Sequence, residues 1–168
     1  DFYSYLIDVF HGEESVFFSW KAGLGMNMIG VVSFYLASPF SLLMVFFDHQ
    51  SVTEGILLIT LLKAAACGLT FSVYTKKVLC LDGTLNLCFS IAYSLMSYVV
   101  VYALNIMWLD GVVLLPLVLL GIHRVQEKGS MLLLSAAYTV LFISQFYIAY
   151  MVGVFSLLYF IGLCVVKK

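Results

Sequence analysis

The sequence predicts an all-α, polytopic bundle of transmembrane helices with a long external segment that carries interfacial amphipathic helices. Three observations predict it. Of the 168 residues, 64% are hydrophobic and only 10% are charged, whereas charged residues make up about 25% of an average soluble domain. The apolar residues form runs that approach the roughly 20 residues needed to cross a bilayer. Basic residues follow these runs, as expected for loops on the cytoplasmic side.

The same composition excludes other classes of protein. The 8 Lys and Arg residues are balanced by 9 Asp and Glu residues and form no basic stripe, so we expect no nucleic-acid partner. The four cysteines form no CxxC pair and no disulfide framework; they are Cys67, Cys80, Cys88 and Cys164. They are interpreted as small apolar packing residues. The three histidines are scattered without metal-ligand spacing, so no metal site is predicted.

Residues 1–53 are predicted to form the external segment. Its first apolar residues recur at helical spacing: Phe2, Tyr5, Leu6, Val9 and Phe10. This spacing predicts a short amphipathic helix at the membrane interface, followed by a Gly-rich loop over residues 19–27.

A second helix is predicted over residues 27–37. Ser38-Pro39 ends this helix, because proline disfavours helix at the residue before it. The apolar residues 40–47 are too few to span, so they are placed at the interface or in a re-entrant element. Thr53 is a candidate cap for the first crossing.

Residues 54–168 are predicted to form the transmembrane module. Its predicted crossings cover about residues 54–74, 85–104, 109–123, 131–145 and 147–166. The last apolar run is divided into two passes. With two passes, Lys167 and Lys168 lie on the same side of the membrane as the basic residues that follow the first and third crossings. With one pass, they would lie on the opposite side. The turn is placed at residues 144–147. Residues 1–53 then lie outside the cytoplasmic membrane, and Lys167-Lys168 lies inside.

Lys63 is the most informative single residue. It lies near the middle of the first crossing, roughly 13 Å along the helix from Glu54. A lysine at mid-bilayer costs about 2.5–3.5 kcal/mol, so a carboxylate, a water-filled cavity or an anionic ligand must offset the charge. We favour a functional cavity. A structural ion pair and snorkelling are the alternatives.

The segment Asn105–Asp110 is predicted to form a tight external turn between the second and third crossings. Trp108 is a natural interface anchor in this turn. Asp110 either points into an external cavity or caps the start of the third crossing, and a carboxylate at this depth could also pair with Lys63. Asn105 is included among the candidate substrate contacts.

Two further pairs of residues are candidate ligand contacts. Trp20 and Lys21 lie in the Gly-rich external loop, where an aromatic face can stack on a sugar and a lysine can neutralise a phosphate. Docking of this loop on the membrane surface is the alternative. Gln145 and Tyr147 lie at the proposed turn between the last two crossings. Turn polarity alone explains Gln145, and the aromatic belt is the favoured explanation of Tyr147; contact with the acceptor or the lipid is the alternative.

An ordered set of short motifs runs through nearly the whole chain. It comprises F-S-W at 18–20, G-L-G-M-N at 23–27, Y-L-A-S-P at 35–39, L-K at 62–63, A-Y-S-L at 92–95, N-I-M-W-L-D at 105–110, L-P-L-V-L-L-G-I at 115–122 and I-S-Q-F-Y-I at 143–148. With these motifs the chain resembles the bacterial YfhO-type membrane proteins. It departs from their pattern at Gln145, where asparagine is expected.

The resemblance implies a fold and an activity. The family is similar to the GT-C superfamily of polytopic glycosyltransferases, which implies sugar transfer from a polyprenyl-phosphate carrier to an extracytoplasmic cell-envelope acceptor such as teichoic acid. The lipid-linked sugar is the donor substrate, and no other cofactor is expected. The resemblance also implies a carboxylate in the first external loop that acts on the acceptor hydroxyl.

That catalytic carboxylate is expected upstream of Asp1, which makes the chain a fragment of a longer protein. Asp8 and Asp110 are the weak candidates within the chain, and Lys21 and Lys63 are the candidate partners of the lipid phosphate. A transporter or lipid flippase with Lys63 as a mid-membrane contact is the alternative. A non-catalytic membrane scaffold is a third possibility.

Overall fold

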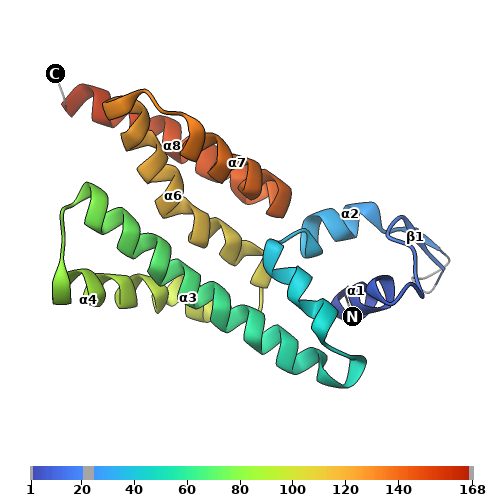
Figure 1. Cartoon of the computed structure of the whole chain (residues 1–168). Coiled ribbons are helices and arrows are strands. Elements are labelled where there is room, and N and C mark those ends of the chain that lie inside the picture. Colours follow the sequence, from blue (N-terminus) through green and yellow to red (C-terminus); the bar gives the residue numbers. More distant parts are fainter. Residues whose placement is uncertain (1, 21–24, 167–168) are drawn as a thin grey trace.

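The computed structural model describes residues 2–20 and 25–166, and helices make up most of this part of the chain (Figure 1). It confirms the predicted all-α membrane bundle. In order, the elements are α1 (Phe2–Phe10), β1 (Phe18–Ser19), β2 (Met26–Asn27), α2 (Ile29–Val31), the π-helical turn η1 (Val32–Leu36), the 3-10 helices η2 (Pro39–Phe46) and η3 (His49–Ser51), α3 (Val52–Val78), α4 (Gly83–Ser94), α5 (Ser97–Val101), α6 (Ile106–Lys128), α7 (Leu132–Ser144) and α8 (Phe146–Val166).

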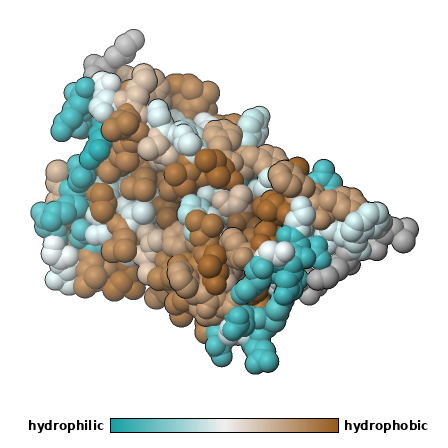
Figure 2. Space-filling view, turned by 45° about the vertical axis from the view of Figure 1, so that its right-hand side comes forward, coloured by the Kyte–Doolittle hydropathy of each residue, from teal (hydrophilic) through white to brown (hydrophobic). Residues whose placement is uncertain are grey.

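Within residues 2–20 and 25–166, four helical stretches are long and apolar enough to cross a membrane. They are His49–Val78, Gly83–Val101, Ile106–Lys128 and Phe146–Val166. The helix α7 is also apolar but has only 13 residues, which is about 20 Å of helix against a hydrocarbon core of about 30 Å. Figure 2 shows a broad apolar surface on one face of the molecule, with hydrophilic atoms gathered toward its two ends, as expected for a protein that lipid surrounds.

Residues 1–53, which the sequence predicts to be external, contain a bent helix pair. Ile29–Leu36 and Pro39–Phe46 meet at an angle of 100°, the geometry of a broken span or a re-entrant loop. The bend lies at Ser38, whose backbone is extended, with Pro39 at the first position of η2. The predicted break at Ser38-Pro39 is therefore present.

The amphipathic helix α1 packs onto this bent pair and onto the bundle. Its buried residues Leu6 and Ile7 share one apolar core with Met44 of η2, Ile59 of α3 and Ile106 of α6. The Gly-rich loop that follows α1 forms a short antiparallel hairpin, in which β1 pairs with β2. Part of that loop, residues 21–24, lies outside the described residues.

The helix α6 lies at the centre of the bundle, against α3 on one side and against α7 and α8 on the other (Figure 1). Two glycines allow the close approach. A Cβ at Gly121 would lie 2.9 Å from the backbone of Leu134 in α7, and one at Gly111 would lie 2.2 Å from the side chain of Ile148 in α8. The positions of α7 and α8 therefore depend on these glycines.

Two sequence-based expectations about helix ends are wrong. The helix α6 begins at Ile106, so the segment Asn105–Asp110 is not a turn. The helix α3 begins at Val52, so Thr53 lies inside it, and a capping box between Asp48 and Ser51 caps the start of the preceding η3 instead.

The second crossing is also not one continuous helix. It is interrupted between α4 and α5, where Met96 is extended. Two hydrogen bonds hold the end of α4 at this point. The Ser94 hydroxyl donates to the Ala64 carbonyl at 2.6 Å, and the Tyr93 hydroxyl donates to the Val112 carbonyl at 2.8 Å. These contacts with α3 and α6 are tertiary, so hydropathy along the sequence could not reveal them.

Candidate functional site

A buried ion pair joins α3 and α6. The Lys63 ammonium lies 2.9 Å from Asp110 Oδ2, and the two side chains are 0% and 3% exposed. Lys63 lies eleven residues into α3, about 16 Å from its start. Asp110 lies one turn into α6. The two charges meet because α6 starts deep in the bundle, close to the middle of α3.

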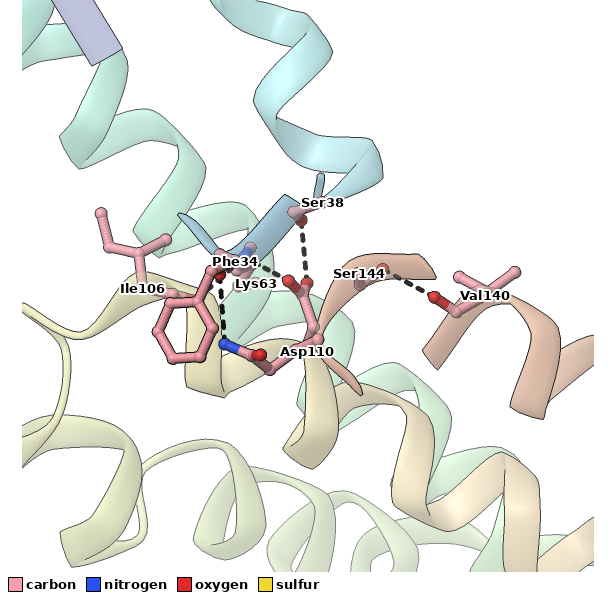
Figure 3. A network of polar contacts seen from close by, with 8 residues as sticks. Phe34, Ser38, Lys63, Ile106, Asp110, Val140 and Ser144 are labelled. Atoms are coloured by element: carbon pink, nitrogen blue, oxygen red, sulfur yellow. Dashed lines mark hydrogen bonds and ion pairs between the residues drawn. The ribbon is translucent and has the colours of Figure 1, made fainter. Parts of the chain in front are cut away.

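The remaining polar atoms of the pair are also bound. The Lys63 ammonium donates to the Ile106 carbonyl at 2.9 Å, and it lies 5.6 Å from the centroid of the Phe40 ring. The Ser38 hydroxyl donates to Asp110 Oδ1 at 3.0 Å. Ser38 and Phe40 flank the bend between η1 and η2, so the ion pair also anchors the bent element (Figure 3).

A second buried polar group lies beside this network, at the break between α7 and α8. Gln145 has an extended backbone and is fully buried. Its side-chain amide donates to the Phe34 carbonyl of η1 at 3.2 Å. Its Oε1 atom has no hydrogen-bond partner among the described residues. The break at Gln145 is thus attached to η1 of the bent pair.

An apolar groove opens next to the network. It has a volume of about 610 Å³ and is lined by Phe2, Tyr3, Tyr35, Leu36, Thr53, Ile56, Leu57, Thr60, Ala103, Leu104, Asn105, Ile106 and Met107. Ile106 connects the two features, since it lines the groove while its carbonyl accepts from Lys63. Burial raises the pKa of the Tyr3 phenol above its ordinary value, so this hydroxyl stays protonated and able to donate.

The site combines an apolar groove with the buried Lys63–Asp110 ion pair, which is separated from the groove by Ile106. Such a site suits an amphiphile with a long apolar part. No group of three His, Cys, Asp or Glu residues that could hold a metal ion exists within residues 2–20 and 25–166.

Comparison with known families identifies the chain. The model of the family described as bacterial membrane protein YfhO matches residues 1–168. The chain belongs to the YfhO family. Comparison with curated proteins and with solved structures finds no match. Family membership and the four apolar helices together make this YfhO chain a bacterial multi-pass membrane protein.

The predicted ligand contacts of the YfhO chain fall in different places. Lys63 and Asp110 come together in the buried network, Gln145 lies beside it with its amide on the Phe34 carbonyl, and Asn105 lines the groove. Trp108 is half-buried and packs on Tyr102, with no hydrogen-bond partner for its indole N–H in the described part of the chain.

The other predicted contacts do not belong to this network. Trp20 is 78% exposed at the end of the hairpin, packed edge-on against Phe18. Tyr147 is 49% exposed in the first turn of α8. The Asp8 carboxylate lies 2.7 Å from His49 Nε2 at the surface. Lys21 lies outside the described residues.

Four residues that contact the ion pair or Gln145 were not predicted from the sequence: Ser38, Phe34, Phe40 and Ile106. Ser38 was interpreted only as part of a helix break, although a serine at a bend can turn its hydroxyl toward a buried acceptor. The backbone carbonyls of Phe34 and Ile106 carry no sequence signal at all, because every residue has a carbonyl.

Proposed function

We propose that this YfhO chain is part of a membrane glycosyltransferase that moves a sugar from a polyprenyl-phosphate carrier to a cell-envelope acceptor such as teichoic acid, outside the cytoplasmic membrane. The observation that carries the proposal is the apolar groove with the buried Lys63–Asp110 pair directly behind its Ile106 wall. A polyprenyl tail is long and apolar, and burial of each CH₂ group in such a groove is worth about 0.8 kcal/mol.

The proposed orientation follows from charge. The groove is lined by the first two turns of α3, whereas Lys77, Arg124 and Lys128 surround the hollow at the far ends of α3 and α6. Basic residues mark the cytoplasmic side, so the groove lies in the outer half of the membrane, where lipid-linked sugars are used by extracytoplasmic transferases. Residues 1–53 are then external.

The roles of the candidate residues follow from their positions. Lys63 already donates to a carboxylate and a carbonyl. It contacts the lipid phosphate directly only if the phosphate displaces Asp110; otherwise its charge acts on the phosphate from behind the residues that line the groove. Trp20, which directly follows β1, and Lys21, the next residue in the sequence, are the proposed contacts of the sugar and its phosphate. Asn105 lies in the groove itself, and Trp108, Gln145 and Tyr147 are proposed as further contacts or supports.

Neither of the two candidate carboxylates, Asp110 and Asp8, is well suited to be the base. Both oxygens of the Asp110 carboxylate are already engaged, one by the Ser38 hydroxyl and the other by the Lys63 ammonium, so neither is free to bind an acceptor hydroxyl. Asp8 is paired with His49. The proposal therefore keeps the catalytic carboxylate upstream of Asp1, in the full-length protein.

The test is sugar transfer by the full-length protein in proteoliposomes supplied with a polyprenyl-phosphate sugar and a teichoic-acid acceptor. Ala103→Trp fills the groove, and Ala65→Trp is a matched control because Ala65 lines a different pocket, between α3 and α4. We expect Ala103→Trp to raise the KM for the donor about tenfold or more, which corresponds to about 1.4 kcal/mol of lost donor binding. Equal effects of both variants, or none, would refute the role of the groove.

A transporter or flippase is the second candidate, because two features of the structure resemble broken transporter helices. The bent pair turns by 100°, and the second crossing is interrupted at Met96. Discontinuous helices often form substrate sites in transporters. Movement of a labelled lipid-linked sugar across the bilayer without transfer to an acceptor would favour this candidate.

A further inference from the structure

A second hollow lies at the other end of α3 from the groove, where α3 and α6 end. Its volume is about 220 Å³, and its lining is Lys77, Val78, Leu120, His123, Arg124, Glu127 and Lys128. Leu57 in the groove and Lys77 in this hollow are both on α3, so the two sites are about 30 Å apart along the helix. The hollow is therefore separate from the site proposed for sugar transfer.

The charges around the hollow are unbalanced. Lys77, Arg124 and Lys128 contribute three positive charges against the single carboxylate of Glu127. Among the described residues, none of the three cations forms a salt bridge within 4.0 Å. The neighbouring Lys76 behaves differently, since its ammonium lies 3.5 Å from an Asp82 carboxylate oxygen. The three cations thus share a field that favours an anion.

The ends of the two helices place these cations at one level. The helix α6 ends at Lys128, with Gly129 in the left-handed conformation, φ 67°. The helix α3 ends at Val78, directly after Lys77. Basic residues in the last turn of a helix are favoured by the helix dipole and by the topology rule. Those two effects explain each cation separately, but not why cations from two helices meet around one hollow.

The rest of the lining is apolar or fixed. Val78 and Leu120 provide an apolar surface. His123 is held in place by its Nε2 atom, 2.8 Å from the Tyr159 hydroxyl, which in turn lies 3.2 Å from the Tyr74 hydroxyl. At about 30 Å³ per water molecule, the hollow has room for roughly seven waters, which is enough for a phosphate group and the atoms next to it.

We propose that this hollow binds the phosphate group of an anionic phospholipid from the surrounding leaflet. Basic pockets between transmembrane helices on the cytoplasmic side bind anionic lipid headgroups. The Arg124 guanidinium matches two phosphate oxygens in one plane, whereas the two lysines act as point charges. The apolar residues of the hollow face the first carbons of the lipid. This inference does not depend on the proposed sugar transfer.

The experiment measures lipid binding by the purified full-length protein, by native mass spectrometry and by the shift of its melting temperature on addition of cardiolipin, phosphatidylglycerol or phosphatidylcholine. The test variant is Arg124→Gln/Lys128→Gln. The control is Lys76→Gln, which removes a nearby cation outside the hollow. We expect the test variant to weaken cardiolipin binding about 30-fold, since each basic residue near an anionic surface contributes about fivefold, and the control to weaken it less than twofold.

Three results would overturn the proposal. Equal losses in the test and control variants would mean that binding reflects general surface charge. Equal binding of phosphatidylcholine would remove the charge argument. A shift produced by inorganic phosphate, with no anionic lipid retained, would assign the hollow to a free anion instead of a lipid. An unchanged melting temperature of both variants in phosphatidylcholine shows that a loss is not caused by misfolding.

Discussion

The Lys63–Asp110 pair allows a quantitative prediction. Lys63→Met removes the ammonium and leaves the Asp110 carboxylate buried, with only the Ser38 hydroxyl as a partner. Asp110→Leu leaves the ammonium buried, with only the Ile106 carbonyl. Removing one partner of a buried pair costs about 3–5 kcal/mol, because the other charge stays in a low-dielectric environment. At 0% exposure, the Lys63 side chain cannot avoid this cost without moving.

The double variant Lys63→Met/Asp110→Leu removes both charges. Replacing a buried pair by apolar side chains of similar size is often neutral or stabilising by about 1–4 kcal/mol. We therefore expect the double variant to be at least as stable as the more stable single variant. The coupling energy between the two substitutions is then expected to be about 3 kcal/mol or more.

The assay is reversible unfolding in mixed micelles, with the free energy of unfolding measured for the original protein, both single variants and the double variant. The exposed pair Lys76–Asp82, with side chains 66% and 74% exposed, supplies a matched cycle, Lys76→Met/Asp82→Leu. Its coupling is expected to be about 0–1 kcal/mol. The reasoning is refuted if the buried singles each cost less than about 1 kcal/mol, or if their costs simply add.

Three further predictions concern packing, the bend and topology. Gly121→Ala should lower the free energy of unfolding by about 1–3 kcal/mol, since the methyl group meets Leu134 backbone atoms; Gly162→Ala, with open space around it, should raise stability by up to about 1 kcal/mol. Ser38→Ala should cost about 1–3 kcal/mol in the same unfolding assay, because Asp110 loses a donor; no change would contradict that bond. A membrane-impermeant maleimide should label Cys80 only from the cytoplasmic side and leave the buried Cys67 unlabelled until unfolding; labelling of Cys80 from outside would reverse the proposed orientation.

The fold class can be predicted well from the sequence, because the composition and the length of the apolar runs depend directly on whether lipid or water surrounds the chain. It also identifies Lys63, since a lysine within an apolar run stands out on any hydropathy scale. The break at Gln145 falls within the stretch 144–147 chosen from polarity. These features depend on a residue and its neighbours in sequence, and such features can be recognised without a structure.

The candidate site could be predicted only in part, because it depends on contacts between distant segments. A carboxylate was one of three groups that could offset Lys63, but its identity as Asp110, 47 residues later in the sequence, depends on how deep in the bundle α6 starts. The bond from Ser38 to Asp110 joins residues 72 positions apart. The groove needs α1, η1, α3 and the start of α6 together, and no local pattern specifies that assembly.

The most direct test of the proposed function is incorporation of a labelled sugar into an envelope polymer by membranes that contain the full-length protein. Polyprenyl-phosphate sugars are supplied as donors, and membranes lacking the protein serve as the reference. The account predicts incorporation that depends on the protein and falls at least about tenfold in Lys63→Met at matched expression. Movement of the donor across the bilayer without incorporation, or a rate of transfer in Lys63→Met equal to that of the original protein, would contradict it.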